Sequence, residues 1–171
     1  VSYILMDFCK HGDFLNFFNQ TKTVFDDTLA RTYFHQLVNG LEYMHSMGAF
    51  HLDIKLNNLL IGDNYQLKIA DFDGAYLKSE GGSPSCRGTK NYRAPELIDG
   101  ECENPSAADV YSAGIVLFAF ITGGHVPFKE SSRSSQYQLF LDTPDLFWKR
   151  KCAELGIPSE SFSEDFKELF S

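Results

Sequence analysis

The stretch His51-Leu52-Asp53-Ile54-Lys55-Leu56-Asn57-Asn58 is the most informative part of this 171-residue chain. Thirteen residues after Asn58 comes a second stretch, Asp71-Phe72-Asp73. Asn58 carries a neutral oxygen ligand and Asp71 a charged one, and both suit Mg²⁺ that is held jointly with nucleotide phosphates. The pattern predicts phosphoryl transfer, in which a protein mainly positions its substrates and neutralises charge.

One acid and one cation lie two residues apart in the same predicted loop. Asp53 could accept the proton of a hydroxyl nucleophile, while Lys55 stabilises charge on the transferred phosphoryl group. The simpler alternative is that Asp53 is an ordinary solvated loop acid. The combined spacing, with Lys68-Ile69-Ala70 leading into Asp71, favours the chemical interpretation.

These two stretches resemble the catalytic loop (H-R-D-x-x-x-x-N) and the D-F-G segment of eukaryotic protein kinases. The resemblance continues in Gly88-Thr89-Lys90-Asn91-Tyr92-Arg93-Ala94-Pro95-Glu96, which is similar to the G-T-x-x-Y-x-A-P-E that closes a kinase activation segment. Asp109-Val110-Tyr111-Ser112-Ala113-Gly114 is similar to the D-V-W-S-x-G that opens the central buried helix of that family. The resemblance implies that Asp109 accepts backbone hydrogen bonds from the catalytic loop.

Two residues are of the kind found at these positions in serine/threonine kinases: Lys55, which lies two residues after the acid, and Thr89. The resemblance implies that the Thr89 hydroxyl bridges Asp53 and Lys55. The alternative is that Lys55 and Thr89 serve loop hydrogen bonds only. By the resemblance the cofactors are ATP and Mg²⁺, and the catalytic residues are Asp53, Lys55, Asn58 and Thr89, with Asn58 and Asp71 as metal ligands.

The beginning of the chain, Met6-Asp7-Phe8-Cys9 followed by Gly12-Asp13, resembles the hinge strand that meets adenine. By that resemblance Met6 is the gatekeeper, Asp7 and Cys9 offer backbone bonds to adenine, and Asp13 faces the ribose. Leu60 forms the floor under adenine. The expected nucleotide-binding residues are therefore Met6, Asp7, Cys9, Asp13, Leu60 and Asp71.

The resemblance implies a protein-kinase-like α+β fold. We expect a mainly α-helical C-lobe with a small β-hairpin, the N-lobe being absent apart from the hinge strand. Apolar periodicity and turn residues predict the elements one by one. They are a buried strand over 2–8, a short helix from Asp13, a long amphipathic helix over 26–48, a hairpin of 58–61 and 66–70, an exposed and mobile segment over 73–93, a nearly all-apolar helix over 107–122, and helices over 133–142 and 163–170. We expect the apolar helix to be too short to span a membrane and to lie in the core.

Two positions depart from the kinase pattern. Leu52 replaces the Arg of H-R-D, which commonly pairs with a phosphorylated activation loop, so we expect that form of switching to be absent. Asp73 replaces the Gly of D-F-G, and Asp tolerates a positive φ better than most residues. Ser79, Ser83 and Ser85 are candidate phosphosites, although a serine in an exposed Gly-Ser loop is usually only solvated.

Several kinase parts have no counterpart in residues 1–171: the glycine-rich loop, the strand lysine, the helix glutamate that pairs with that lysine, and the late C-lobe arginine that pairs with the equivalent of Glu96. We expect a partial protein kinase domain, covering the hinge and most of the C-lobe, whose missing N-lobe is a partner in cis.

Net charge and cysteine spacing limit the kinds of partner and the cellular setting that we expect. A formal net charge of −8 argues against nucleic acid or an anionic membrane surface as the main partner. Four widely spaced cysteines without a C-x-x-C pair favour a reducing, cytoplasmic setting over a disulfide framework or a zinc site. The histidines outside the catalytic loop (His11, His35, His45 and His125) are expected to be surface or packing residues.

The expected function is transfer of the γ-phosphoryl group of ATP to a Ser or Thr hydroxyl of a protein substrate, by the complete protein. One alternative is a non-catalytic, pseudokinase-type binding or scaffold module, but a scaffold has no need of Asp53, Lys55, Asn58 and Asp71 together. A small-molecule kinase of related fold is a weaker alternative, because the A-P-E and D-V-Y-S-x-G motifs count against it.

Overall fold

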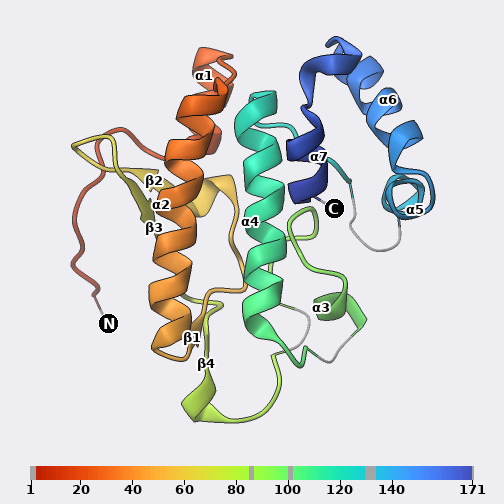
Figure 1. Cartoon of the computed structure of the whole chain (residues 1–171). Coiled ribbons are helices and arrows are strands. Elements are labelled where there is room, and N and C mark those ends of the chain that lie inside the picture. The colour runs from red at the N-terminus through yellow and green to blue at the C-terminus, as the bar shows by residue number, and fades with distance from the viewer. Residues whose placement is uncertain (1–2, 85–86, 100–101, 130–133, 171) are drawn as a thin grey trace.

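A computed structural model describes residues 3–84, 87–99, 102–129 and 134–170. Ser2 of the predicted strand, the candidate phosphosite Ser85, and Cys86 lie outside these residues. Within the described part, the chain forms seven α-helices and two small antiparallel sheets of two strands each (Figure 1). The predicted mainly helical α+β fold is therefore confirmed.

Two long helices lie side by side through the middle of the molecule (Figure 1). Helix α2 (Asp27–Ser46) begins where the Asp26 side chain accepts a hydrogen bond from the Leu29 amide, and Gly48 follows its end with a φ of +71°. Helix α4 (Pro105–Thr122) is capped by Asn104, with proline in its first turn. Both predicted helices are confirmed, and their ends follow ordinary capping rules.

Helix α4 is the centre of the core, although its length alone does not show this. By length and composition its 18 residues could cross a membrane, so the expectation that it is too short was wrong. Burial gives the better argument, because 61% of the helix is buried inside the fold. Phe118 and Phe120 are fully buried, and a helix that is apolar all round is typical of such a position.

Aromatic side chains fill the space between α4, α2 and helix α1 (Phe14–Thr21). The ring centroid of Phe14 lies 4.9 Å from that of Tyr33 and 5.1 Å from that of Phe120, at angles typical of packed aromatic pairs. Asp13 caps α1, as the sequence predicts. Phe14 and Phe120 are therefore core residues, and this packing fixes α1 and α2 on either side of the segment that carries the site.

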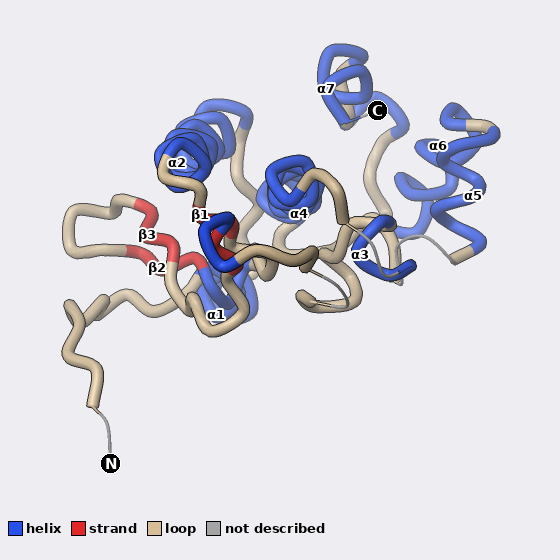
Figure 2. The backbone as a smooth tube through the Cα atoms, turned by 90° about the horizontal axis from the view of Figure 1, so that it is seen from below, coloured by secondary structure: helices blue, strands red, loops and turns tan. Residues whose placement is uncertain are grey.

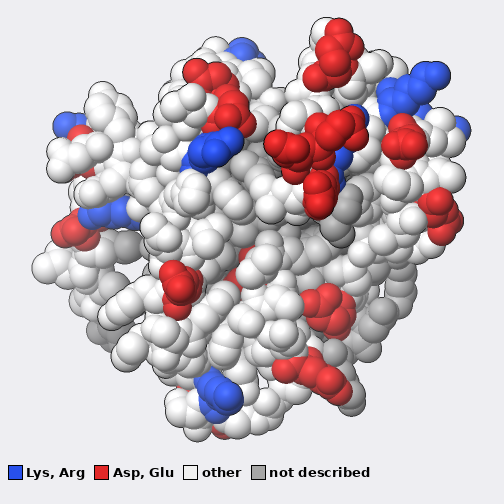
Figure 3. All heavy atoms as spheres, viewed as in Figure 1, with Lys and Arg blue, Asp and Glu red and all other residues white. Residues whose placement is uncertain are grey.

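Three further helices follow α4: α5 (Ser135–Asp142), α6 (Pro144–Leu155) and α7 (Glu164–Phe170). Helices α5 and α7 were predicted, but α6 was not, because charged residues interrupt its apolar pattern. Its start signal, proline in the first turn, was available in the sequence. Acidic side chains gather over α7, in agreement with the net charge of −8 (Figure 3).

The two sheets are short but position the site. Strand β2 (Leu59–Ile61) pairs with β3 (Leu67–Ile69), which confirms the predicted hairpin. Strand β1 (Ala49–Phe50) pairs with β4 (Tyr76–Leu77), inside the segment 73–93 that was expected to be exposed and not part of the core. The expectation was wrong for Tyr76 and Tyr92, whose buried aromatic side chains bring these parts of the segment into the fold, whereas residues 77–83 are exposed as predicted.

The predicted buried strand at the beginning of the chain is also wrong. The described residues 3–9 form no strand, and large side chains such as Tyr3, Leu5 and Phe8 are at least 85% exposed. Figure 2 shows this segment leading away from the helices and sheets. A strand needs a neighbour for its backbone N–H and C=O groups, and no strand lies alongside it among the described residues.

Burial of Tyr92 gives the fold a pH dependence at high pH. Burial raises the pKa of Tyr92 from 10.0 to about 12. The folded chain therefore disfavours the tyrosinate, so the stability that Tyr92 contributes is complete below pH 10 and is lost as the pH rises towards about 12. The expected loss is at most about 1.4 kcal/mol per pH unit.

Urea unfolding of the full-length protein at several pH values between about 9 and 12 measures this slope. We expect Tyr92→Phe to reduce it relative to the wild type. Tyr33 and Tyr137, whose pKa values burial also raises, remain in both proteins and therefore cancel in the comparison. Equal slopes in the two proteins would contradict the prediction.

Candidate active site

A buried carboxylate in α4 holds the catalytic loop in place. Asp109 is fully buried, and its Oδ1 accepts a hydrogen bond from the Leu52 amide at 2.7 Å. Its Oδ2 accepts one from the His51 amide at 2.9 Å. These are the backbone contacts that the sequence resemblance implied for Asp109, and they supply the partners that a buried carboxylate requires.

His45, in the last turn of α2, completes this arrangement. Its Nε2 lies 2.9 Å from Asp109 Oδ2, and its side chain is 17% exposed. The prediction that His45 is a surface or packing residue is confirmed by the contact of its ring with that of Phe50, 5.3 Å between centroids, but its hydrogen bond with Asp109 was not predicted. The spacing gives only the face of the helix, because His45 lies four residues after the buried Leu41 and so shares its inward side.

His51 links the catalytic loop to the segment that leads into Asp71. Its side chain is fully buried, and Nε2 lies 3.0 Å from the carbonyl oxygen of Ala70. A carbonyl can only accept, so the proton is on Nε2 and Nδ1 is left to accept from the Asp53 amide at 3.3 Å. One neutral tautomer therefore satisfies both contacts.

The predicted acid, cation and hydroxyl meet at one point. Lys55 Nζ donates to Asp53 Oδ2 at 2.6 Å and to Thr89 Oγ1 at 3.0 Å. The Thr89 hydroxyl donates to Asp53 Oδ1 at 2.7 Å. The side chains of Asp53 and Lys55 are each 20% exposed, so the acid is held rigidly and is still open to a substrate.

Asn58 is buried beside this cluster. Its Nδ2 donates to the backbone carbonyl of Asp53 at 2.9 Å and contacts Asp53 Oδ2 at 3.3 Å. Its own backbone carbonyl accepts from the Ala70 amide at 2.8 Å. Because Nδ2 is committed to the loop, Oδ1 is the atom of this side chain that can bind a cation.

Asp71 follows β3 at the same open end of the β2–β3 hairpin as Asn58, and its side chain is exposed. Asp71 has a φ of +67°, whereas Asp73, which stands in place of the Gly of D-F-G, does not have a positive φ. Asn58 Oδ1 and the Asp71 carboxylate are oxygen donors of the kind Mg²⁺ prefers. No group of three or more His, Cys, Asp or Glu in the described ranges could hold a metal ion. The roles of Asn58 and Asp71 as Mg²⁺ ligands, with phosphates and water completing the set, stay predictions.

The expected nucleotide residues are only partly brought together. Asp13 and Leu60 form an isolated β-bridge, which places the end of the hinge segment against β2. The Asp13 carboxylate caps α1 through the Asn16 amide at 2.9 Å. Asp7 pairs with Lys68 at 3.1 Å, whereas Cys9 is half-buried and Met6 is 66% exposed. The roles of Met6, Asp7, Cys9, Asp13 and Leu60 towards a nucleotide stay predictions.

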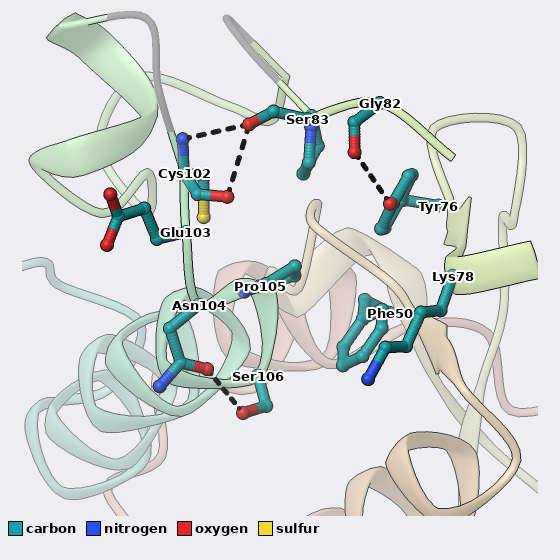
Figure 4. A pocket seen from close by; sticks show the side chains of 11 residues that line it. Phe50, Tyr76, Lys78, Gly82, Ser83, Cys102, Glu103, Asn104, Pro105 and Ser106 are labelled. Carbon is teal, nitrogen blue, oxygen red and sulfur yellow. Dashed lines mark hydrogen bonds between the residues drawn. The ribbon is translucent and has the colours of Figure 1, made fainter. Parts of the chain in front are cut away.

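A cavity of about 620 Å³ lies elsewhere, between the two-stranded sheet β1–β4 and the start of α4 (Figure 4). Phe50 and Tyr76 form part of its wall, and Ser83 borders it, its hydroxyl donating to the Cys102 carbonyl at 3.2 Å. None of the predicted catalytic or metal-binding residues lines this cavity. The cluster around Asp53 is therefore separate from this cavity.

Comparison with known proteins identifies the family. Residues 1–171 match the family model described as the protein kinase domain. The chain belongs to the protein kinase family. It is 35% identical over 170 residues to the CBL-interacting serine/threonine-protein kinase 24 of Arabidopsis thaliana. The aligned region covers 98% of this chain and 35% of that protein.

Other relatives agree with this assignment. The kinase domain is 32% identical over 171 residues to the CBL-interacting protein kinase 26 of Oryza sativa subsp. japonica, covering 98% of this chain and 32% of the relative. It is 34% identical over 164 residues to the serine/threonine protein kinase OSK3 of Oryza sativa subsp. indica, and the aligned region covers 92% of this chain and 29% of the relative. The chain thus belongs among the serine/threonine protein kinases and spans about a third of the length of these relatives.

One departure from the kinase pattern now has a structural setting. Leu52, which stands where the kinase motif has arginine, is 2% exposed and belongs to an apolar cluster with Phe50, Tyr76 and Leu97 of helix α3 (Glu96–Asp99). Its backbone has a φ of +62°. The catalytic loop of this kinase domain therefore presents an apolar side chain inward at this position, where a cation would be needed to bind a phosphate.

Proposed function

We propose that the complete protein transfers the γ-phosphoryl group of ATP to a serine or threonine hydroxyl of a protein substrate. The three-way contact among Asp53, Lys55 and Thr89 carries this proposal. These side chains come from the catalytic loop and from the activation segment, 34 residues or more apart in sequence. A site that served only to hold a loop would not need an acid, a cation and a hydroxyl at one partly open point.

Asp53 orients the substrate hydroxyl and accepts its proton as the substrate oxygen bonds to the γ-phosphorus. The bond between that phosphorus and the β–γ bridging oxygen breaks, and ADP leaves with the electron pair. An ionised carboxylate has about four acceptor positions. Thr89, Lys55 and Asn58 occupy only some of those on Asp53, so one remains for the substrate.

Lys55 and Thr89 preorganise the reaction. Lys55 offers positive charge to the transferred phosphoryl group, where charge accumulates in the transition state. The Thr89 hydroxyl contacts both Lys55 and Asp53 and so fixes their positions relative to each other. Asn58 and Asp71 would hold Mg²⁺, which when bound neutralises phosphate charge. In the same proposal Leu60, Asp13 and the hinge residues Met6, Asp7 and Cys9 bind the nucleoside of ATP.

Thr89→Val and Thr89→Ser provide a matched test in the full-length protein. Valine keeps the shape of threonine but has no hydroxyl, whereas serine keeps the hydroxyl. Loss of hydrogen bonds to two charged groups is expected to lower kcat/KM by roughly 10- to 100-fold in Thr89→Val. We expect Thr89→Ser to stay close to the wild type.

The measurement is transfer of labelled γ-phosphate from Mg²⁺-ATP to a mixed protein substrate, followed by phosphoamino-acid analysis. Label on serine and threonine is expected. Label on tyrosine alone would contradict the acceptor that we propose. A folded wild-type protein without transfer to any protein would overturn the catalytic proposal and favour the binding module.

A further inference from the structure

The guanidinium of Arg87 joins the two ends of the activation segment. Its Nη1 donates to the backbone carbonyls of Gly74 at 3.0 Å and of Ala75 at 2.9 Å. Gly74 and Ala75 follow directly after Asp71-Phe72-Asp73, whereas Arg87 is 12 to 13 residues further along the chain. Arg87 is half-buried, so its cation makes these contacts partly shielded from water.

Arg87 directly precedes the two residues of the activation segment, Gly88 and Thr89, that contact the catalytic loop. Gly88, with a φ of +89°, packs so tightly on the catalytic loop that a Cβ there would collide with the carbonyl oxygen of Leu52. Thr89 follows and donates its hydroxyl to Asp53. Arg87 therefore connects the segment that carries Asp71 to the turn that supports Asp53.

Leu52 explains why such a connection is needed. A kinase that orders its activation segment by phosphorylation needs a cation to receive the phosphate. The buried Leu52 packs on Phe50, Tyr76 and Ala94 at the position where the kinase motif has that cation. The bonds from Arg87 to Gly74 and Ala75 come from within the segment and require no phosphate.

We propose that Arg87 is a positioning residue that locks the activation segment onto the catalytic loop, so that the active site assembles without phosphorylation of that segment. The inference rests on the proposed kinase function. Arg87 touches no reacting atom. Through its bonds to Gly74 and Ala75 it fixes the position of Asp71. Through the following residues, Gly88 and Thr89, it fixes the position of Asp53.

The test uses full-length protein from which phosphate has been removed, with its unmodified mass verified. Misplacement of catalytic groups by about 1 Å costs roughly 100-fold in rate. We therefore expect Arg87→Ala to lower kcat by about 10- to 100-fold, to raise the Mg²⁺ concentration required for half-maximal activity, and to leave KM for the protein substrate little changed. Arg87→Lys keeps a cationic donor and is expected to recover part of kcat.

Arg31→Ala is the matched control, because the Arg31 side chain is 69% exposed and its partner, Asp27, is also on the surface. Its kcat should equal that of the wild type. Hydrogen exchange gives a readout that needs no catalysis. Amides of residues 72–77 are expected to exchange faster in Arg87→Ala than in the wild type or in Arg31→Ala.

The possible outcomes separate this inference from the proposed function. Unchanged kcat together with unchanged exchange in Arg87→Ala would overturn the role of Arg87. A dephosphorylated wild type that is inactive and regains activity on phosphorylation of the segment would overturn independence from phosphate. A wild type that is inactive under all conditions, with faster exchange in Arg87→Ala, would refute the kinase function and still support the structural lock.

Discussion

Asp53→Asn in the full-length protein is expected to lower kcat by about 10²- to 10⁴-fold, which is the usual contribution of a general base. Asparagine has nearly the same shape, so the loop should keep its conformation. Its amide cannot accept the proton of the substrate hydroxyl at neutral pH. It also removes the negative charge that Lys55 Nζ contacts at 2.6 Å, so Lys55 is held less firmly, mainly by Thr89.

The measurement is phosphotransfer under saturating Mg²⁺-ATP, with the melting temperature recorded for each variant. Asp165→Asn is a suitable control, since Asp165 is an exposed acid in α7. An Asp53→Asn protein that is folded and nearly as active as the wild type would show that Asp53 is not the base. If binding of a protein partner were the only measurable property and survived the change, the scaffold alternative would replace the kinase proposal.

Asp109→Ala is expected to cause the largest loss of stability. It leaves the amides of His51 and Leu52 without their acceptors, and each orphaned buried N–H costs about 1–3 kcal/mol. The sum is about 2–6 kcal/mol. The catalytic loop begins at these amides, so we expect phosphotransfer to fall together with the free energy of unfolding.

Urea unfolding followed by circular dichroism measures the effect in the full-length protein. Asp142→Ala, at an exposed acid near the end of α5, is the control and should change stability by less than about 0.5 kcal/mol. Asp109→Asn retains one oxygen acceptor and should fall between Asp109→Ala and the wild type. A loss below about 1 kcal/mol in Asp109→Ala would mean that the loop is held by other contacts.

The elements predicted best have strong local signals. Helices α2 and α4 are long and carry clear caps, and the β2–β3 hairpin has apolar runs on either side of Gly62. Helix α6 was missed because charged residues interrupt its apolar pattern. In each case local periodicity decided how well the sequence could be interpreted.

The wrong predictions concern segments whose conformation depends on a neighbour. The apolar composition of residues 3–8 is typical of a buried strand, but a strand forms only beside a partner. The segment 73–93 is rich in small and polar residues, and residues 77–83 are exposed as predicted, but the burial of Tyr76 and Tyr92 draws the rest of it towards the fold. Composition describes such segments poorly because burial depends on the surfaces that meet them.

The sequence alone determined the family, the helical fold and the chemical set of the candidate site, because ordered motifs and their spacing are local properties of the chain. The tertiary structure alone decided the contacts of His45 with Asp109 and of Arg87 with Gly74 and Ala75. His45 and Asp109 are 64 residues apart in sequence. Such contacts follow from the packing of α2 against α4 and from the path of the activation segment over the catalytic loop, which no local pattern encodes.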